Sequence, residues 1–283
     1  MQIIDGKMVS QQVREELKTE ITEAKDKFWA PMGLAVIIVG ENPASKVYVR
    51  NKVKACEEVG ITSLHYELPS DTTSDELNEL IDELNGRRDV NGILVQLPLP
   101  AHLNEKDVLN RIAVQKDVDG FSPYQMGKLV IGEPDLVACT PKGVMVMLER
   151  YGIDVCGMNV AILGRSNIVG KPIAHLMLQK NATVTICHTK TKNLEEVLSN
   201  ADLVVVAVGR AKLVKSNMIK EGAIVVDVGI NRQEDGKLCG DVDFEDVKEK
   251  CSFITPVPGG VGPMTITMLL SNTLKAYIEQ NAR

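Results

Sequence analysis

The stretch NVAILGRSNIVGKPIAHLMLQKNATVTICH, residues 159–188, decides the fold of this chain. Its apolar run Val160–Leu163 predicts a buried strand, and the β-branched run Thr183–Ile186 predicts a second one. Between them, apolar residues recur at helical spacing from Ile173 to Met177. The stretch therefore predicts a strand, turn, helix and strand of the length typical of dinucleotide-binding units.

The turn after the first predicted strand lacks bulky side chains at Gly164, Ser166 and Gly170. Such a turn lets the backbone approach a pyrophosphate, and the N-terminus of the following helix offers unpaired N–H groups to it. The pattern departs from GxGxxG, because Ser166 stands at the second glycine position, Val169 at the third, and Gly170 one residue later. A dinucleotide site is the prediction, and a plain βαβ crossover is the alternative.

The composition is that of a globular protein without nucleic-acid or membrane partners. A length of 283 residues favours two domains. The net charge of −6, with no cluster of Lys or Arg, argues against nucleic-acid binding. Six scattered cysteines without a C-x-x-C pair indicate neither a zinc site nor a disulfide framework. We find no targeting segment and no apolar run long enough to span a bilayer, so we expect a reduced, cytoplasmic, soluble protein.

Strands and helices alternate through both halves of the chain, which predicts an α/β fold with a mainly parallel sheet. In the first half, strands are expected at 34–40, 61–68 and 92–100, and helices at 7–28, 42–60, 74–85 and 104–111. Residues 117–140 are rich in Gly, Pro and Asp and are predicted to be a loop, followed by a connecting helix at 141–152. In the second half, we expect a helix at 193–200, strands at 202–208, 223–229 and 252–255, a hairpin at 236–242 and a final helix at 264–280.

Tyr48 and Lys52 are candidates for proton transfer in the first half. They stand at positions i and i+4 of the predicted 42–60 helix, so they share a face beside its apolar stripe. An amine partly removed from water and hydrogen-bonded by a phenol suits proton transfer near neutral pH. The alternative is a surface lysine whose stem lies along the apolar stripe.

Gln96 and Asp119 are two further polar candidates. Gln96 interrupts an apolar strand near its carboxyl end, where ligands bind in open α/β sheets. A structural hydrogen bond to neighbouring backbone is the alternative role. Asp119 belongs to an Asp-Gly turn dipeptide in KDVDG and is by itself most simply a turn residue, while Asp117 is expected to be a cap or an ion-pair partner.

The end of the second predicted Rossmann strand, CHTKTKN at 187–193, carries cations where an NAD enzyme carries an acid. A carboxylate is expected about here to bind the ribose hydroxyls of NAD, and none is present. With Arg165 in the glycine turn, this loop favours the 2′-phosphate of NADP. A solvated basic loop is the alternative.

The segment TPVPGGVGPMT, residues 255–265, combines fixed prolines with three glycines directly before a helix. This composition predicts a stiff loop whose backbone can press against a ligand.

Taken together, YVRNK, VQLPLP, KDVDG, GRSNIVGKP, CHTKT, DVGIN and PGGVGPMT resemble the bifunctional methylenetetrahydrofolate dehydrogenase/cyclohydrolases in order and spacing, over essentially the whole chain. The resemblance implies an N-terminal folate-binding catalytic domain, residues 1–140, joined by the C-terminal helix 264–283. It implies a Rossmann NADP-binding domain at residues 141–263, with folate in the cleft between the two domains.

The resemblance also implies roles for individual residues. Lys52, Tyr48 and Gln96 match the catalytic residues, with Gln96 orienting the lysine. Substrate-binding positions are matched by Asp119 at the pterin, by Tyr48, and by Pro258, Gly259, Gly260 and Pro263 in the loop that lines folate and nicotinamide. Cofactor-binding positions are matched by Gly164, Arg165, Ser166, Gly170, His188, Thr189 and Ile230.

The implied activity is oxidation of 5,10-methylenetetrahydrofolate with NADP to the methenyl form, followed by hydrolysis to 10-formyltetrahydrofolate, in one-carbon metabolism and purine biosynthesis. The implied assembly is a homodimer, for which the strand run 201–209 is a candidate contact. One competing interpretation is a dehydrogenase of the shikimate or amino-acid type, which predicts a Lys–Asp pair and no PGGVGP loop. Another is a non-catalytic Rossmann-like sensor that binds dinucleotide without turnover.

Overall fold

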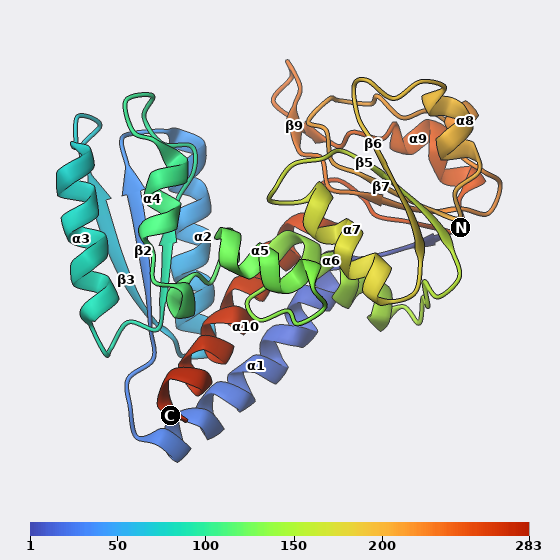
Figure 1. Ribbon diagram of the computed structural model, residues 1–283. Coiled ribbons are helices and arrows are strands. Elements are labelled where there is room, and N and C mark those ends of the chain that lie inside the picture. The colour runs from blue at the N-terminus through green and yellow to red at the C-terminus, as the bar shows by residue number, and fades with distance from the viewer. Residues whose placement is uncertain (283) are drawn as a thin grey trace. The chain divides into compact units, whose positions relative to one another are not determined.

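The computed structural model describes residues 1–282, which divide into two units (Figure 1). We call residues 12–139 and 266–282 the N-terminal unit, and residues 1–11 and 140–265 the Rossmann unit. Residues 1–11 were expected in the first domain, and in the structure they pack with the Rossmann unit. Strand β1 (Gln2–Ile3) pairs in parallel with β11 (Phe253–Ile254), which anchors the N-terminus in the Rossmann sheet.

The N-terminal unit is built on a parallel three-stranded sheet in the order β3-β2-β4. Its central strand β2 (Gly33–Val39) is buried at every residue because β3 (Thr62–Leu68) and β4 (Gly92–Val95) flank it. Helices α2 (Pro43–Val59), α3 (Ser74–Gly86) and α4 (Glu105–Arg111) connect and follow the strands. Each has a polar side chain at its N-terminus, with Asn42, Thr73 and Asn104 accepting backbone N–H groups.

The final helix returns to the first half, as predicted. Helix α10 (Val261–Asn281) lies along α1 (Gly6–Phe28) within the N-terminal unit (Figure 1). Arg14 donates to Thr267 at 3.0 Å, and the hydroxyl of the fully buried Tyr277 donates to the carbonyl of Ala30 at 2.9 Å. These contacts join opposite ends of the chain into one folded unit.

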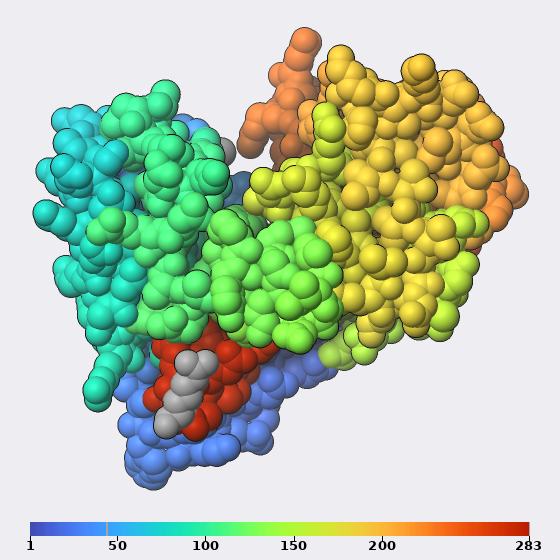
Figure 2. Space-filling model, viewed as in Figure 1, coloured from blue at the N-terminus to red at the C-terminus, as the bar shows by residue number. Residues whose placement is uncertain are grey.

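The prediction of a loop at 117–140 is wrong. Helix α5 (Pro123–Val130) occupies its middle, and α6 (Cys139–Arg150) begins two residues before the predicted start; η1 (Val114–Lys116) precedes them. Ser122 caps α5 by accepting the N–H of Gln125, and proline stands at the first position of this helix. The space-filling view shows this part of the chain at the surface of the unit (Figure 2).

The Rossmann unit contains a parallel six-stranded sheet in the order β1-β11-β8-β7-β5-β6. Its remaining strands are β5 (Asn159–Leu163), β6 (Thr183–Cys187), β7 (Leu203–Val206) and β8 (Ile224–Asp227), and its helical segments are α7 (Gly170–Gln179), α8 (Leu194–Ser199), η2 (Ser216–Met218), α9 (Phe244–Val247) and η3 (Lys248–Lys250). The predicted hairpin is β9 (Asn231–Arg232) paired with β10 (Leu238–Cys239).

Strand β7 lies in the interior of this sheet, between β5 and β8, and its four residues are buried. It therefore offers no free strand edge, and a subunit contact through the run 201–209 with its flanks stays a prediction. The exposed edge is β6, where Thr183, Thr185 and Ile186 are open to solvent.

Among the helices of residues 1–282, none combines the length and the apolar character that crossing a bilayer requires.

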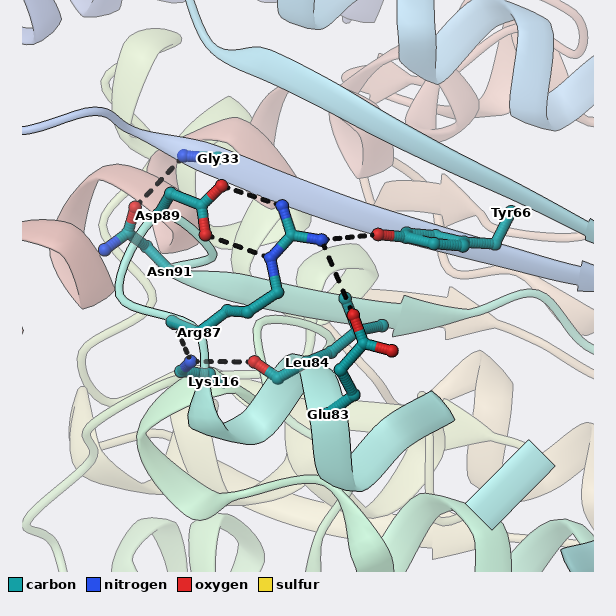
Figure 3. Close-up of polar contacts among 8 residues, drawn as sticks. All are labelled: Gly33, Tyr66, Glu83, Leu84, Arg87, Asp89, Asn91 and Lys116. Atoms are coloured by element: carbon teal, nitrogen blue, oxygen red, sulfur yellow. Dashed lines mark hydrogen bonds and ion pairs between the residues drawn. The ribbon is translucent and has the colours of Figure 1, made fainter. Parts of the chain in front are cut away.

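A polar cluster at the end of α3 stabilises the N-terminal unit (Figure 3). The amine of buried Lys116 donates to the carbonyl of Leu84 at 2.9 Å and to that of Arg87 at 2.6 Å. Arg87 in turn holds Asp89 with two hydrogen bonds and donates to the Tyr66 hydroxyl. Lysine at a helix C-terminus satisfies carbonyls that lack intrahelical partners.

We expect Lys116→Met to lower the free energy of unfolding by about 1–3 kcal/mol, because the Arg87 carbonyl loses its donor and the Leu84 carbonyl keeps only the backbone N–H of Arg87 at 3.3 Å, while the side-chain volume is kept. Urea unfolding measures the change. Lys106→Met, at an exposed position of α4, is the control and should stay within about 0.5 kcal/mol of wild type. Equal stability of both variants would show that the Lys116 contacts contribute nothing.

Candidate active site

Lys52 is a buried lysine on α2, only 9% exposed, whose amine donates to Oε1 of Gln96 at 3.0 Å. Tyr48 shares that face one turn earlier but is 42% exposed, and no described residue hydrogen-bonds its hydroxyl. The expected phenol–amine hydrogen bond is therefore absent from the described residues, and an amide occupies that position instead. The ammonium keeps two further N–H groups available for other partners.

Gln96 follows β4 directly and is fixed from both sides. Its backbone N–H donates to Ile37 at 2.8 Å, and its Nε2 donates to the carbonyl of Leu97 at 2.7 Å. Because the amide nitrogen is held by backbone, the amide oxygen faces Lys52. Gln96 thus forms the structural backbone hydrogen bond considered from the sequence, and its oxygen accepts from Lys52; binding of a ligand at this strand end stays a prediction.

Asp119 lies close enough to Lys52 for the two charges to interact. Burial raises the pKa of the Asp119 carboxyl to about 6, while the charge of Lys52 acts in the opposite direction. The Cys139 thiol is 3.9 Å from one carboxylate oxygen, and no other described residue donates to it. By contrast, Asp117 accepts three backbone N–H groups and forms no ion pair with a described residue, so it is a turn cap. Asp119 thus carries acceptor oxygens available to a ligand.

Asn272 supports this site and was not anticipated from the sequence. It is fully buried on α10, and its Nδ2 donates to the carbonyls of Val118 and Val137, both at 2.8 Å. It therefore fixes the residue before Asp119 from the far end of the chain. A polar residue on an otherwise apolar helix is a weak signal, because the sequence does not show which segment it meets.

In the Rossmann unit, the glycine turn leaves no room for side chains. A Cβ on Gly164 would lie 2.3 Å from the carbonyl oxygen of Ala207, and one on Gly170 would lie 2.2 Å from the carbonyl oxygen of Gly164. The φ of +131° at Gly164 also requires glycine. Gly170 thus provides the close contact of helix and turn despite its shifted position in the motif.

Ser166 and Arg165 lie at the start of α7. The Ser166 hydroxyl accepts the N–H groups of Val169 at 3.1 Å and Gly170 at 3.3 Å, and its own hydrogen remains free to donate. Arg165 is exposed and has no ion-pair partner among residues 1–282. A helix N-terminus with a free hydroxyl donor and a free guanidinium suits a phosphate group.

The loop after β6 is closed on itself by three hydrogen bonds. Thr191 Oγ1 accepts the N–H of His188 at 2.8 Å, the Thr191 N–H donates to the His188 carbonyl, and the Lys190 N–H donates to His188 Nδ1 at 3.1 Å. The backbone N–H, the carbonyl and Nδ1 of His188 are therefore used within the loop, whereas Thr189 is exposed and no described residue hydrogen-bonds its hydroxyl. Thr191 was missed from the sequence because Ser/Thr turns leave only a weak local signal.

The loop 255–265 surrounds a cavity of about 140 Å³, lined among others by Ile230, Pro258, Gly259, Gly260 and Pro263. These five residues, all predicted to bind ligand, are thus brought together. The start of α1 presses against the loop: a Cβ on Gly6 would lie 1.9 Å from the Gly260 carbonyl oxygen, and the Lys7 N–H donates to Gly259 at 3.0 Å. Gly6 was not anticipated, because the contact joins residues far apart in sequence.

A larger open groove of about 750 Å³ in the N-terminal unit contains none of the predicted residues. Its lining includes Arg14, Lys54 and Glu58, and an ion pair joins Arg14 to Glu58. The residues predicted for proton transfer and anion binding thus lie outside this groove.

Comparisons with known proteins find two domains that meet near residues 120–140, although their bounds differ from the units at residues 4–11 and in the final helix. Residues 4–119 match the catalytic domain of the tetrahydrofolate dehydrogenase/cyclohydrolases, and residues 138–281 match their NAD(P)-binding domain. The chain is 56% identical over 274 residues to the bifunctional protein FolD of Agathobacter rectalis, covering 97% of this chain and 98% of that protein.

Solved structures are equally similar. The FolD methylenetetrahydrofolate dehydrogenase/cyclohydrolase of Campylobacter jejuni superposes with a TM-score of 0.96 at 53% identity, covering 98% of each chain. The Trypanosoma brucei enzyme, solved with NADP cofactor and inhibitor, superposes with a TM-score of 0.94 at 37% identity, covering 99% of this chain and 98% of that one.

Proposed function

This chain belongs to the tetrahydrofolate dehydrogenase/cyclohydrolase family, and we propose that it oxidises 5,10-methylenetetrahydrofolate with NADP and hydrolyses the methenyl product to 10-formyltetrahydrofolate. The observation that carries the proposal is the hydrogen bond of buried Lys52 to Gln96, with Asp119 close by, in the unit that matches the catalytic domain. The competing interpretation as a dehydrogenase of the shikimate or amino-acid type predicts no PGGVGP loop, and this chain carries one.

The residues of the Rossmann unit fit NADP. Gly164 and Gly170 leave the backbone of the turn bare, while Arg165, Ser166 and Thr189 offer a cation and two hydroxyl donors free of acidic partners. The segment 187–193 contains no carboxylate that would repel a 2′-phosphate. When bound, NADP supplies the acceptor for the hydride of the methylene carbon. The contribution of the chain to that step is orientation by the glycine turn and the loop 255–265.

Hydrolysis places different demands on the chain, because protons must move. Water that attacks the methenyl carbon loses a proton, and the departing ring nitrogen gains one. Lys52 is the residue placed for this transfer, and Gln96 holds its amine in one orientation. Asp119 binds the pterin ring with its available oxygens, and Tyr48 lies at the substrate side of the same helix face. Each of these roles is part of the proposal.

Arg165→Ala tests the cofactor assignment. Loss of a charge-assisted phosphate contact costs about 1.5 kcal/mol at an exposed position, so affinity for NADP should fall roughly tenfold. Affinity for NAD, which lacks the 2′-phosphate, should change less than twofold. Titration of both cofactors measures the change, and Arg150→Ala, at the exposed end of α6, is the control. An equal loss for NAD and NADP would assign Arg165 to another part of the cofactor.

The activity itself is tested by supplying methylenetetrahydrofolate with NADP and, separately, with NAD. Methenyltetrahydrofolate and NADPH absorb in the same ultraviolet band, so acid quenching is needed to separate them. Formation of methenyl product with NADP, and its decay on further incubation with the chain, are expected. Binding of NADP without turnover would instead support a ligand sensor.

We further infer a homodimer, a cytoplasmic location and a role in supplying formyl groups to purine biosynthesis. The open edge β6 is a surface through which two sheets could associate, since unpaired strand edges readily pair with another chain. All six cysteines are free thiols and five of them are buried, which suits a reducing compartment. A monomer in analytical ultracentrifugation at micromolar concentration would contradict the dimer.

A further inference from the structure

Asp241 is a fully buried carboxylate in the Rossmann unit that accepts four hydrogen bonds. The backbone N–H groups of Val208, Gly209 and Arg210 donate at 2.7, 2.9 and 2.8 Å, and Nδ2 of Asn231 donates at 2.9 Å. Three successive N–H groups that converge in this way form a concave anion site. Here the anion belongs to the chain itself.

A second buried carboxylate continues this network. Asp227, at the end of β8, accepts the N–H groups of Gly229 at 2.9 Å, Asp241 at 3.0 Å and Val242 at 2.8 Å. Its own N–H donates to Thr255 Oγ1 at 2.7 Å. Among the described residues, neither carboxylate forms an ion pair, so amide donors alone compensate the buried charges.

The packing around both carboxylates leaves no room for a side chain at positions 229 and 240, which are both glycine. A Cβ on Gly229 would lie 2.2 Å from Cγ of Asp241, and a Cβ on Gly240 would lie 1.8 Å from Oδ2 of Asp227. The two carboxylates and the strand ends that they bind therefore have one tight arrangement. Any displacement of Asp241 must move the backbone that it holds.

That backbone borders three segments assigned to the cofactor site. Val208 directly follows Ala207, whose carbonyl oxygen allows no Cβ on Gly164. Asn231 directly follows Ile230, and Asp227 lines the same cavity as Gly259 and Gly260. Val208 follows β7 and Asp227 ends β8, so both lie at carboxyl ends of parallel strands, where α/β sheets bind ligands. None of them belongs to the candidate 2′-phosphate site at Arg165 and Thr189.

We propose that Asp241 is a positioning residue for the nicotinamide half of the cofactor, acting through Val208–Arg210 and Asn231. The inference rests on the proposed function, because it assumes that NADP binds this unit. Asp241 touches no reacting atom; it fixes the strand ends against which the nicotinamide ring is oriented. Its loss should therefore disturb hydride transfer while leaving the phosphate-binding end intact.

The test is Asp241→Asn, which preserves shape but turns an amide NH₂ toward two N–H donors. We expect NADP affinity to fall about tenfold, dehydrogenase kcat to fall similarly, and the deuterium isotope effect on hydride transfer to increase. Binding of adenosine 2′,5′-bisphosphate, which lacks the nicotinamide half, should change less than twofold. Asp243→Asn is the matched control, because Asp243 pairs with Lys215 outside the network and should bind NADP as wild type does.

Two results would overturn the proposal: unchanged NADP affinity and kcat, or an equal loss of affinity for NADP and for the bisphosphate, which indicates general damage to the unit. Should Asp241→Asn fail to fold, Asn231→Ala removes one donor while three backbone donors remain, and it should show the same selective loss at about threefold. Wild-type protein that binds no NADP would instead overturn the proposed function, so the two failures are distinguishable.

Discussion

Replacing Lys52 with glutamine should reduce cyclohydrolase activity by about 10²–10⁴-fold while dehydrogenase activity survives, since this is the range that general acid–base catalysis contributes. Hydride transfer needs no proton to enter or leave a protein group, so its rate depends mostly on how the two substrates are held. Opening the methenyl ring requires both a proton acceptor and a proton donor. Methenyltetrahydrofolate should therefore accumulate and be released by the variant.

The structure supports this separation because Lys52 is buried and held by one neutral partner. Its hydrogen bond goes to the Gln96 oxygen, and the Gln96 amide nitrogen is fixed by the Leu97 carbonyl. Glutamine at position 52 keeps polarity and nearly the length of lysine but carries no transferable proton near neutral pH. The hydrogen bond to Gln96 can still form, so the surrounding fold should persist.

The measurement pairs acid-quenched dehydrogenase rates with the decay of methenyl absorbance. Lys54→Gln, at an exposed position of the same helix, is the control and should retain both activities. A parallel loss of both activities on Lys52→Gln would assign the amine to substrate positioning. Persistence of the cyclohydrolase would place the proton carrier elsewhere.

Local signals were sufficient to predict much of the fold. The β2 strand is an unbroken apolar run because both of its neighbours are parallel strands, and α2 matches the predicted helix 42–60, with Asn42 capping its start and Gly60 following its end. The glycine turn was also identified despite its altered spacing, since its chemistry depends on bare backbone at Gly164 and Gly170. In each case the residues that decide the structure are neighbours in sequence.

Helix α5 shows how composition misleads over a longer window. Residues 117–140 are rich in Gly, Pro and Asp, which suggested a loop, yet Ser122 and Pro123 are a helix-start signal when taken as a pair. Buried Gln125 then fastens the helix by accepting from Leu136 and donating to Val114. Such tertiary bonds stabilise a short helix that propensity alone does not predict.

The residues that support the site were the hardest to predict, because their partners are distant in sequence. Asp241 binds a segment about thirty residues earlier, and Asn272 binds carbonyls more than a hundred residues away. An acid at the end of the apolar strand β8 is a detectable signal for Asp227, but its three amide partners appear only in the fold. Lys52 and Gln96 were named separately, and only the structure shows their hydrogen bond.

Asp119→Asn should reduce kcat/KM of both activities by about a hundredfold, since a charged acceptor to the pterin is lost from a partly buried site. Affinity for NADP should stay unchanged, because the Rossmann unit keeps all its contacts.

The same substitution, Asp119→Asn, should stabilise the folded state although it lowers activity. Burial raises the pKa of Asp119 from its ordinary 3.8 to about 6, so the ionised carboxylate destabilises the folded state above pH 6.

Between pH 3.8 and 6 the folded state binds more protons at Asp119 than the unfolded state does, so this residue lowers the free energy of unfolding as pH rises through that window. Asp119→Asn removes this buried charge and should raise the free energy of unfolding of the N-terminal unit at pH 7.5 by about 1–3 kcal/mol. Asp117→Asn is the matched control: it weakens three backbone hydrogen bonds and should destabilise the unit.

Ionisation of Asp119 should strengthen substrate binding, whereas it weakens folding. If the carboxylate form binds the pterin, the wild-type KM for folate should rise about tenfold for each pH unit below 6, and the Asp119→Asn variant should show no such rise. KM measured between pH 5 and 8, together with urea unfolding at both ends of that range, tests binding and stability on the same protein. A variant with wild-type KM at pH 7.5 would leave Asp119 as a turn residue. A variant that is both inactive and less stable would show that its carboxylate supports the fold.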